Sequence, residues 1–191
     1  MLGEPQHKKD KDTEKNILLQ LRNSQSFEKG FRLLVQTYQE RLYWHIRKMV
    51  IIHDDADEVL QNTFIKVFKG FKNFRGDAKL YAWLYRIATN ECLTFLKKRK
   101  KHSTIDLDND ESGIANSLKA DSYFSGDDAI VVLNKAMDIL PKKQKQVFVM
   151  RYYDQLSYKD ISEMLDTSVG GLKASYHHAV KKIERYVKDN V

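Results

Sequence analysis

The chain has 191 residues, of which 42% are hydrophobic and 31% charged, with a net charge of +7 and one cysteine, Cys92. A single cysteine excludes an internal disulfide. No apolar run approaches the roughly 18 residues that a membrane span needs, and no signal peptide opens the chain, so we expect a cytoplasmic protein that does not bind a membrane.

The charge is distributed in three blocks. The net charge is +9 over residues 1–101, −6 over residues 102–128 and +4 over residues 129–191. Basic blocks suit a polyanionic partner, because lysine and arginine gain free energy by displacing condensed counterions. Many basic proteins never bind nucleic acid, so the charge pattern needs support from motifs.

Three amphipathic helices are predicted in the first basic block. Apolar residues spaced three and four apart run from Phe27 to Met49, from Ala56 to Phe71 and from Leu80 to Cys92. The second helix begins among carboxylates, which favour the positive end of a helix dipole. The third ends in five consecutive cations. We expect one helical domain over residues 16–101, after a disordered tail at residues 1–15.

Residues 102–127 lose this periodicity and are rich in Ser, Asp, Asn and Gly, as in a flexible linker. Asp127 or Asp128 can cap the next helix, and Pro141 suits the first position of another. No strand shows convincing alternation. The expected fold class is therefore all-α, with two small helical domains joined by a flexible acidic linker, the second domain spanning residues 128–191.

Two short helices with a tight turn between them are predicted after Leu156. Ser157 can cap the first helix in an imperfect capping box with Asp160, and Ser168 can cap the second. The second helix has a polar outer face, as in a helix-turn-helix, where it would enter the major groove. An ordinary helical hairpin gives the same pattern. Gly170-Gly171 in its first turn either lets the backbone approach a phosphate or only loosens the helix start.

Aromatic residues are interleaved with cations between Phe74 and Lys101. Exposed rings beside cations suit single-stranded DNA, since bases stack on the rings while the cations hold phosphates. The alternative is that these rings belong to the core. Periodicity favours the core for Trp83, and it favours exposure for Tyr81 and Tyr85.

Three segments, taken in order, resemble the extracytoplasmic-function (ECF) sigma factors of the sigma-70 family. Residues 54–68 are similar to the helix of that family that binds core RNA polymerase. Phe74-Arg75-Gly76 with residues 82–90 resembles the part of region 2 that recognises and melts the −10 element. Leu140-Pro141, Arg151-Tyr152-Tyr153 and residues 156–179 resemble region 4, which reads the −35 element. The resemblance covers about residues 17–101 and 128–188.

The resemblance implies a sigma factor, a fold of region 2 bundle plus region 4 helix-turn-helix, and no catalytic site, metal or cofactor. It implies core RNA polymerase (β′ clamp helices and β flap), promoter DNA and an anti-sigma factor as partners. The implied polymerase contacts are Asp54, Asp57, Glu58, Gln61, Asn62 and Ile65. The implied −10 contacts are Arg75, Gly76, Asp77, Lys79, Tyr81, Trp83, Arg86, Asn90, Lys97, Lys98 and Arg99. The implied −35 contacts are Ser168, Gly170, Lys173, Ala174, Ser175, His177, His178, Lys181 and Lys182.

Two positions depart from the family pattern. Ser175 stands where arginine is frequent, and Gly171 where threonine or serine is common. Arginine is the residue that most often recognises guanine, through two hydrogen bonds to the base. Without it, we expect −35 recognition here to depend mainly on phosphate contacts and groove shape.

Two other functions compete with this interpretation. A regulator that binds an operator without polymerase explains residues 140–188, but it explains neither residues 54–68 nor residues 74–101. A nuclease could use Asp54, Asp55, Asp57 and Glu58 as metal ligands, although a position at a helix start explains these acids without metal.

Overall fold

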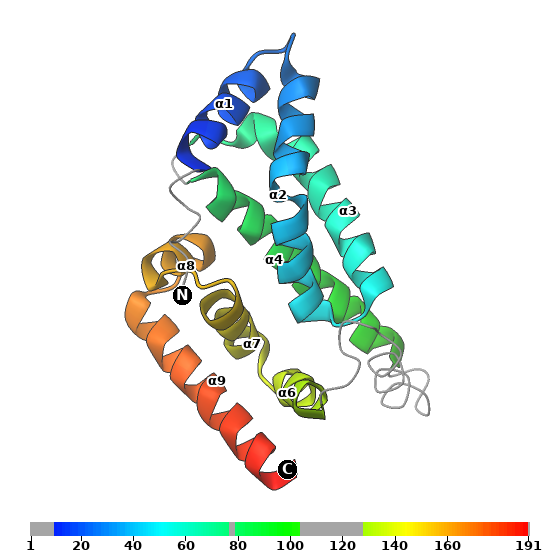
Figure 1. Cartoon of the computed structure of the whole chain (residues 1–191), viewed down its shortest axis with the longest axis vertical. Coiled ribbons are helices and arrows are strands. Elements are labelled where there is room, and N and C mark those ends of the chain that lie inside the picture. Colours follow the sequence, from blue (N-terminus) through cyan, green and yellow to red (C-terminus); the bar gives the residue numbers. More distant parts are fainter. Residues whose placement is uncertain (1–9, 77–78, 104–127, 191) are drawn as a thin grey trace.

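The structure, a computed structural model, describes residues 10–76, 79–103 and 128–190, and every regular element in these ranges is helical (Figure 1). Asp77 and residues 104–127 of the expected linker lie outside the described residues, whereas the first two residues of that linker, 102–103, belong to the helix that begins at Leu80. None of the described helices is long and apolar enough to cross a membrane.

The first half consists of four helices: α1 (Asp10–Arg22), α2 (Phe27–Val50), α3 (His53–Gly70) and α4 (Leu80–Ser103), with a 3-10 turn at Phe71–Asn73. Their apolar faces meet in one core, as the predicted periodicity requires. Helix α1 begins at Asp10, so residues 10–15, which we expected in a disordered tail, are helical. Burial of Ile17 and Leu21 holds α1 on the bundle.

The second half contains α6 (Asp128–Asp138), α7 (Lys142–Phe148), a π-helical turn (Val149–Tyr153), α8 (Tyr158–Leu165) and α9 (Val169–Asn190). Pro141 is the extended residue that precedes α7, one position earlier than predicted. Both predicted caps are confirmed: Ser157 Oγ accepts from the Asp160 amide at 3.1 Å, and Ser168 Oγ accepts from the Gly171 amide at 3.2 Å. A left-handed Asp166 turns the chain between α8 and α9, which completes a helix-turn-helix.

The two halves pack against each other. Helix α8 contacts α4, beside which it lies in Figure 1, and the π-helical turn contacts α2. The larger apolar cluster therefore includes Leu42 and Leu84 of the first half together with Met150 and Ile161 of the second. A smaller cluster joins α6, α7 and α9.

Candidate nucleic-acid interface

The residues predicted to contact polymerase gather on the outer face of α3. Asp54, Glu58, Gln61, Asn62 and Ile65 are exposed, and Asp57 is half-buried. Ile65 is 50% exposed and Phe68, one turn further along, 49%. Acidic and apolar groups thus share one accessible helix face.

Asp55 differs from its acidic neighbours because it binds α4. Its Oδ2 lies 3.1 Å from Arg99 Nη1. Burial raises the pKa of the Asp55 carboxyl, although the positive charge of Arg99 opposes this shift. Arg99, a predicted −10 contact, is therefore engaged in an ion pair, whereas Lys97 and Lys98 beside it are exposed.

The predicted −10 residues lie in the loop before α4 and along α4 itself. Arg75, Gly76, Lys79, Arg86 and Asn90 are exposed. Gly76 has φ +86°, a left-handed conformation that glycine adopts without strain.

The aromatic side chains of α4 are buried or partly buried. Trp83 is partly buried, and the centre of its ring lies 5.0 Å from the ring centre of Phe74 and 6.2 Å from that of Phe71. Tyr81 is half-buried. The expectation that Tyr85 is exposed is wrong: it is only 8% exposed, because its ring lies against His45 of α2 at 4.9 Å between ring centres.

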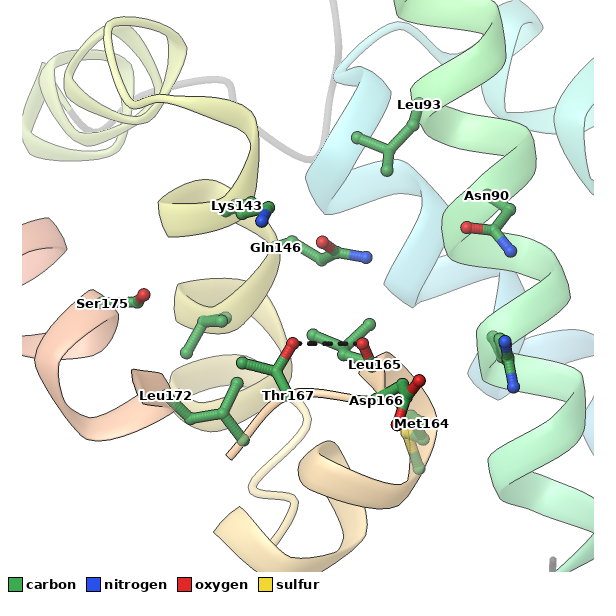
Figure 2. A pocket seen from close by; sticks show the side chains of 12 residues that line it. Asn90, Leu93, Lys143, Gln146, Met164, Leu165, Asp166, Thr167, Leu172 and Ser175 are labelled. Carbon is green, nitrogen blue, oxygen red and sulfur yellow. Dashed lines mark hydrogen bonds between the residues drawn. The ribbon is translucent and has the colours of Figure 1, made fainter. Parts of the chain in front are cut away.

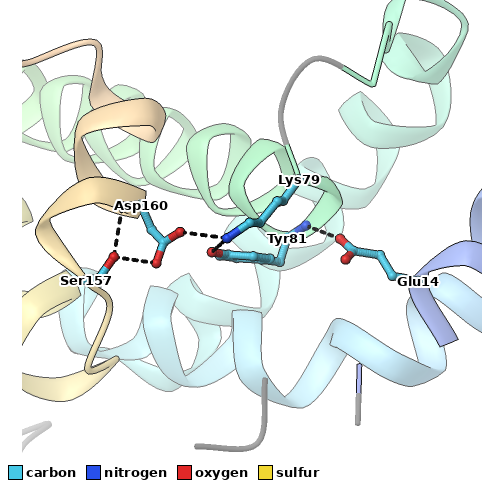
Figure 3. A network of polar contacts seen from close by, with 5 residues as sticks. All are labelled: Glu14, Lys79, Tyr81, Ser157 and Asp160. Carbon is cyan, nitrogen blue, oxygen red and sulfur yellow. Dashed lines mark hydrogen bonds and ion pairs between the residues drawn. The ribbon is translucent and has the colours of Figure 1, made fainter. Parts of the chain in front are cut away.

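A polar network connects the −10 residues to α8 (Figure 3). Lys79 Nζ lies 3.1 Å from Asp160 Oδ1, and the Tyr81 hydroxyl is hydrogen bonded to the same carboxylate. Glu14 of α1 accepts a hydrogen bond from the Tyr81 amide at 3.1 Å. Burial and the hydrogen bond to Asp160 raise the pKa of the Tyr81 hydroxyl, so this hydroxyl remains a donor.

The predicted −35 residues follow the outer face of α9. Ser168, Gly170, Lys173, Ala174, His177, His178, Lys181 and Lys182 are exposed, and Ser175 is half-buried. The Lys173 ammonium lies 5.9 Å from the centre of the Tyr158 ring, and the Arg151 guanidinium lies 5.2 Å from it.

The two glycines at the start of α9 differ in their surroundings. A Cβ at Gly170 would meet open space, whereas a Cβ at Gly171 would lie 3.2 Å from Ser168 Oγ. Gly171 therefore leaves room for the cap that begins the helix.

A cleft of about 340 Å³ separates the two predicted DNA-contacting faces (Figure 2). Arg86 and Asn90 line it from α4, while Asp166 and Ser175 line it from the helix-turn-helix. The structure thus brings predicted −10 and −35 residues to opposite walls of one cleft.

Metal binding at the start of α3 is not supported by the geometry. Within the described ranges, no group of three or more His, Cys, Asp or Glu side chains is arranged to hold a metal ion. The nuclease alternative requires such a group among Asp54, Asp55, Asp57 and Glu58.

Sequence reasoning missed the polar residues that join the two halves. His45 and Asp154 bind each other across 109 positions of sequence, and no local pattern indicates such a pair. Asp160 was recognised only as a helix-capping residue, and nothing in its spacing predicts its contact with Lys79.

Taken together, a helical bundle with an exposed cationic face and a helix-turn-helix define a DNA-binding transcription protein. Comparison with known families supports this class: sigma-70 region 2 matches residues 34–102, and sigma-70 region 4 matches residues 130–183.

Known proteins resemble the chain over most of its length. The ECF RNA polymerase sigma factor SigW of Bacillus subtilis is 30% identical over 171 residues, covering 84% of this chain and 90% of SigW. The ECF RNA polymerase sigma-E factor of Escherichia coli K12 is 27% identical over 169 residues, covering 84% of this chain and 88% of that protein. The chain belongs to the ECF RNA polymerase sigma factors of the sigma-70 family, and such factors are initiation factors rather than enzymes.

The fold is also similar to those of two solved structures. The structure of CnrH in complex with the cytosolic domain of CnrY has a TM-score of 0.68 at 18% identity, covering 94% of this chain and all of that one. The sigma factor RpoE from Bartonella quintana, in complex with the anti-sigma factor NepR, has a TM-score of 0.63 at 19% identity, covering 84% of this chain and 98% of that one.

Proposed function

We propose that this sigma factor binds core RNA polymerase and directs it to promoters by melting the −10 element with its first half and docking on the −35 element with its second. The observation that supports the proposal most is the division of exposed cations between α4 with its preceding loop and α9, in the family's order of regions.

The outer face of α3 is the proposed contact with the β′ clamp helices. Asp57, Gln61 and Ile65 lie on successive turns of this face, so a partner helix can contact all three. The second half would contact the β flap, which would set the spacing between the two DNA-contacting faces.

The −10 strand would lie along the start of α4. Lys79, Arg86 and Asn90 offer donors for phosphates and bases, and the half-buried rings of Tyr81 and Trp83 offer surfaces for stacking. The loop at Arg75 and Gly76 would hold a base that has left the stack, since the glycine backbone leaves room for close approach.

The −35 duplex would receive α9 in its major groove. The polar face from Lys173 to His178 would approach the base edges, while Lys181 and Lys182 would contact phosphates. With Ser175 in place of arginine, direct guanine recognition would be weak, so backbone contacts and groove shape would carry more of the binding.

An anti-sigma factor is a further proposed partner, because the sigma factor RpoE from Bartonella quintana, which has a similar fold, was solved in complex with the anti-sigma factor NepR. Both the polymerase and the promoter would place the activity of this chain in the cytoplasm.

The test is transcription with purified components. Sigma-free core polymerase, this protein and a library of genomic DNA fragments should yield transcripts that begin at shared −35 and −10 sequences. Ile65→Glu should weaken core binding at least tenfold, because it places a charge in an apolar contact. Gln25→Ala, an exposed change in the turn between α1 and α2, should leave binding unchanged.

The alternatives give other outcomes. Sequence-specific duplex binding without any promoter-directed transcription would favour an operator-binding regulator. Metal-dependent cleavage of the fragments would favour a nuclease.

A further inference from the structure

The cleft between α4 and the second half has the composition of a small-molecule site. Its volume of about 340 Å³ lies at the lower end of the range of about 300–1,000 Å³ that ligand pockets span. Apolar side chains from four helices line part of it (Figure 2): Leu93, Val147, Met164, Leu165 and Leu172. Ligand pockets combine such a lining with a few polar groups that orient the ligand, so the polar residues of the cleft decide which ligand it takes.

Gln146 of α7 is a buried polar residue whose amide points into this cleft. It is only 6% exposed, and within the described part of the chain its side chain takes part in no hydrogen bond. Figure 2 shows the Gln146 amide extending from α7 toward α4, and the Asn90 amide extending from α4 into the same space. Because a buried amide without a partner costs free energy, a ligand that hydrogen bonds to Gln146 gains affinity there.

The charged groups of the cleft favour an anion. Arg86 of α4 and Lys143 of α7 line it, against the single carboxylate of Asp166 in the turn before α9. Among the described residues no ion pair engages Arg86 or Lys143, whereas Lys145 on the same helix as Lys143 binds Asp138 at 2.7 Å. A phosphate suits such cations, because both the guanidinium group and the ammonium group donate charge-assisted hydrogen bonds to its oxygens.

The two amides indicate what the rest of the ligand is. Each offers one acceptor and two donors, and Asn and Gln amides form paired hydrogen bonds with the edge of adenine. The flat faces of a nucleobase suit the apolar lining beside these amides. The half-buried hydroxyl of Ser175, on the wall formed by α9, is a further partner for a polar group such as a ribose hydroxyl.

We propose that this cleft binds a nucleoside monophosphate, and that adenine is the base that its amides suit best. The cations hold the phosphate, Gln146 and Asn90 bind the edge of the base, and the apolar side chains cover its faces. The inference goes beyond the proposed function, because this site requires neither promoter DNA nor polymerase.

The first test is isothermal titration calorimetry of the full-length protein at constant ionic strength. The probes are the four nucleoside monophosphates, adenosine and inorganic phosphate. Adenosine monophosphate (AMP) should bind at least about tenfold more tightly than adenosine or inorganic phosphate, because only AMP makes both sets of contacts. Absence of binding by all four mononucleotides would overturn the site, and so would equal affinity for inorganic phosphate and AMP.

Variants on α7 place the nucleotide in the cleft, because α7 carries no proposed DNA contact. Gln146→Leu and Lys143→Met should each weaken AMP binding at least about tenfold. Gln146→Leu removes an unpartnered buried amide, so it should fold, and its melting temperature checks this. The matched control is Lys142→Met, which removes the same charge from the neighbouring exposed position, outside the cleft lining, and should keep its affinity within about twofold. AMP binding that neither α7 variant weakens would overturn the site.

The second test identifies the bound position directly. A photoreactive azido derivative of AMP should label peptides of α7, and excess AMP should prevent this labelling. Label confined to the loop at Arg75 or to the outer face of α9 would place the nucleotide on a DNA-contacting surface and would overturn the site. The proposed function is judged separately, since a protein that binds AMP in the cleft but supports no promoter-directed transcription retains the site and loses only that function.

Discussion

At the scale of single residues, neighbouring side chains decide which cations can reach DNA. Lys173 and Arg151 share the ring of Tyr158, which restricts the long lysine side chain near the start of α9. Arg99 is held by Asp55, whereas Lys181 and Lys182 are exposed. The cationic residues near the two DNA-contacting faces therefore differ in how readily they can contact DNA.

Removing the charges of Lys173, Lys181 and Lys182 together by alanine substitution should weaken binding to all duplex sequences. Each lost phosphate contact should flatten the slope of log affinity against log salt by roughly 0.9. The measurement is a salt titration of duplex binding, with Lys135→Ala and Lys142→Ala, exposed positions on other helices, as the control. An unchanged slope in the triple variant would contradict phosphate contact by α9.

Cys92 should react slowly with thiol reagents in the folded protein. Burial raises the pKa of its thiol, and the positive charge of Lys145 offsets this only in part, so the thiol remains protonated at pH 8. Only the thiolate reacts, and each unit by which the pKa of the thiol rises lowers the thiolate fraction about tenfold. Labelling at pH 8 should be far faster in denaturant; equal rates with and without denaturant would show that Cys92 is accessible.

At the scale of helices, close contact between two helices explains why glycine occupies a particular position. A Cβ at Gly30 of α2 would lie 2.8 Å from both Gln20 Cβ and the Leu21 amide nitrogen of α1. The absence of a side chain therefore lets α1 lie directly on α2. This contact places Glu14 beside the Tyr81 amide.

Gly30→Ala should lower the free energy of unfolding by about 1–3 kcal/mol, because the added methyl group forces α1 away from α2. Urea denaturation followed by circular dichroism would measure this change. Gly170→Ala adds the same methyl group to a helix where a Cβ meets open space, so it serves as the control for the gain of helix propensity. Unchanged stability of Gly30→Ala would show that α1 is not held at this distance.

The paired glycines of α9 should respond in opposite directions to alanine. Gly170→Ala adds helix propensity in open space and should stabilise the protein by up to about 1 kcal/mol. Gly171→Ala gains the same propensity but crowds the Ser168 cap, so its net gain should be smaller or negative. Comparison of the two melting temperatures tests the difference, and a larger gain at residue 171 would contradict it.

At the scale of the whole molecule, both halves contribute to one apolar cluster. The π-helical turn matters here, because it brings Asp154 to His45 and is followed by Leu156, which is buried in the shared core. The two halves should unfold together as long as the contact between them persists. The number of thermal unfolding transitions should therefore report whether the halves are joined.

The unmodified protein should unfold in a single calorimetric transition. Asp160→Lys, which places two ammonium groups together at Lys79, should split this into two transitions. Glu184→Lys introduces the same charge change on the exposed face of α9 and should retain one transition. A single unshifted transition for Asp160→Lys would mean that the Asp160 contact adds nothing to the joining of the halves.

Local chemistry made much of the fold predictable. Spacing of apolar residues predicted α2, α3 and α4 because one buried face must recur with the helix period. The Ser157 and Ser168 caps and the helix-turn-helix were also predictable, since a cap depends on residues only three positions apart. Helix α1 was not predicted as a helix, because its charged residues carry no apolar pattern before Ile17.

The sequence by itself determined the helical class, the order of the two regions and the exposed cations of α4 and α9, because each depends on period, capping or charge along a short stretch. Only the tertiary structure decided that Tyr85 is buried against His45, that Asp55 holds Arg99, and that Asp154 and Asp160 bind the first half. These contacts join residues between 40 and 109 positions apart. Such pairs form when packed helices bring distant side chains together, and no local pattern encodes which helices will pack.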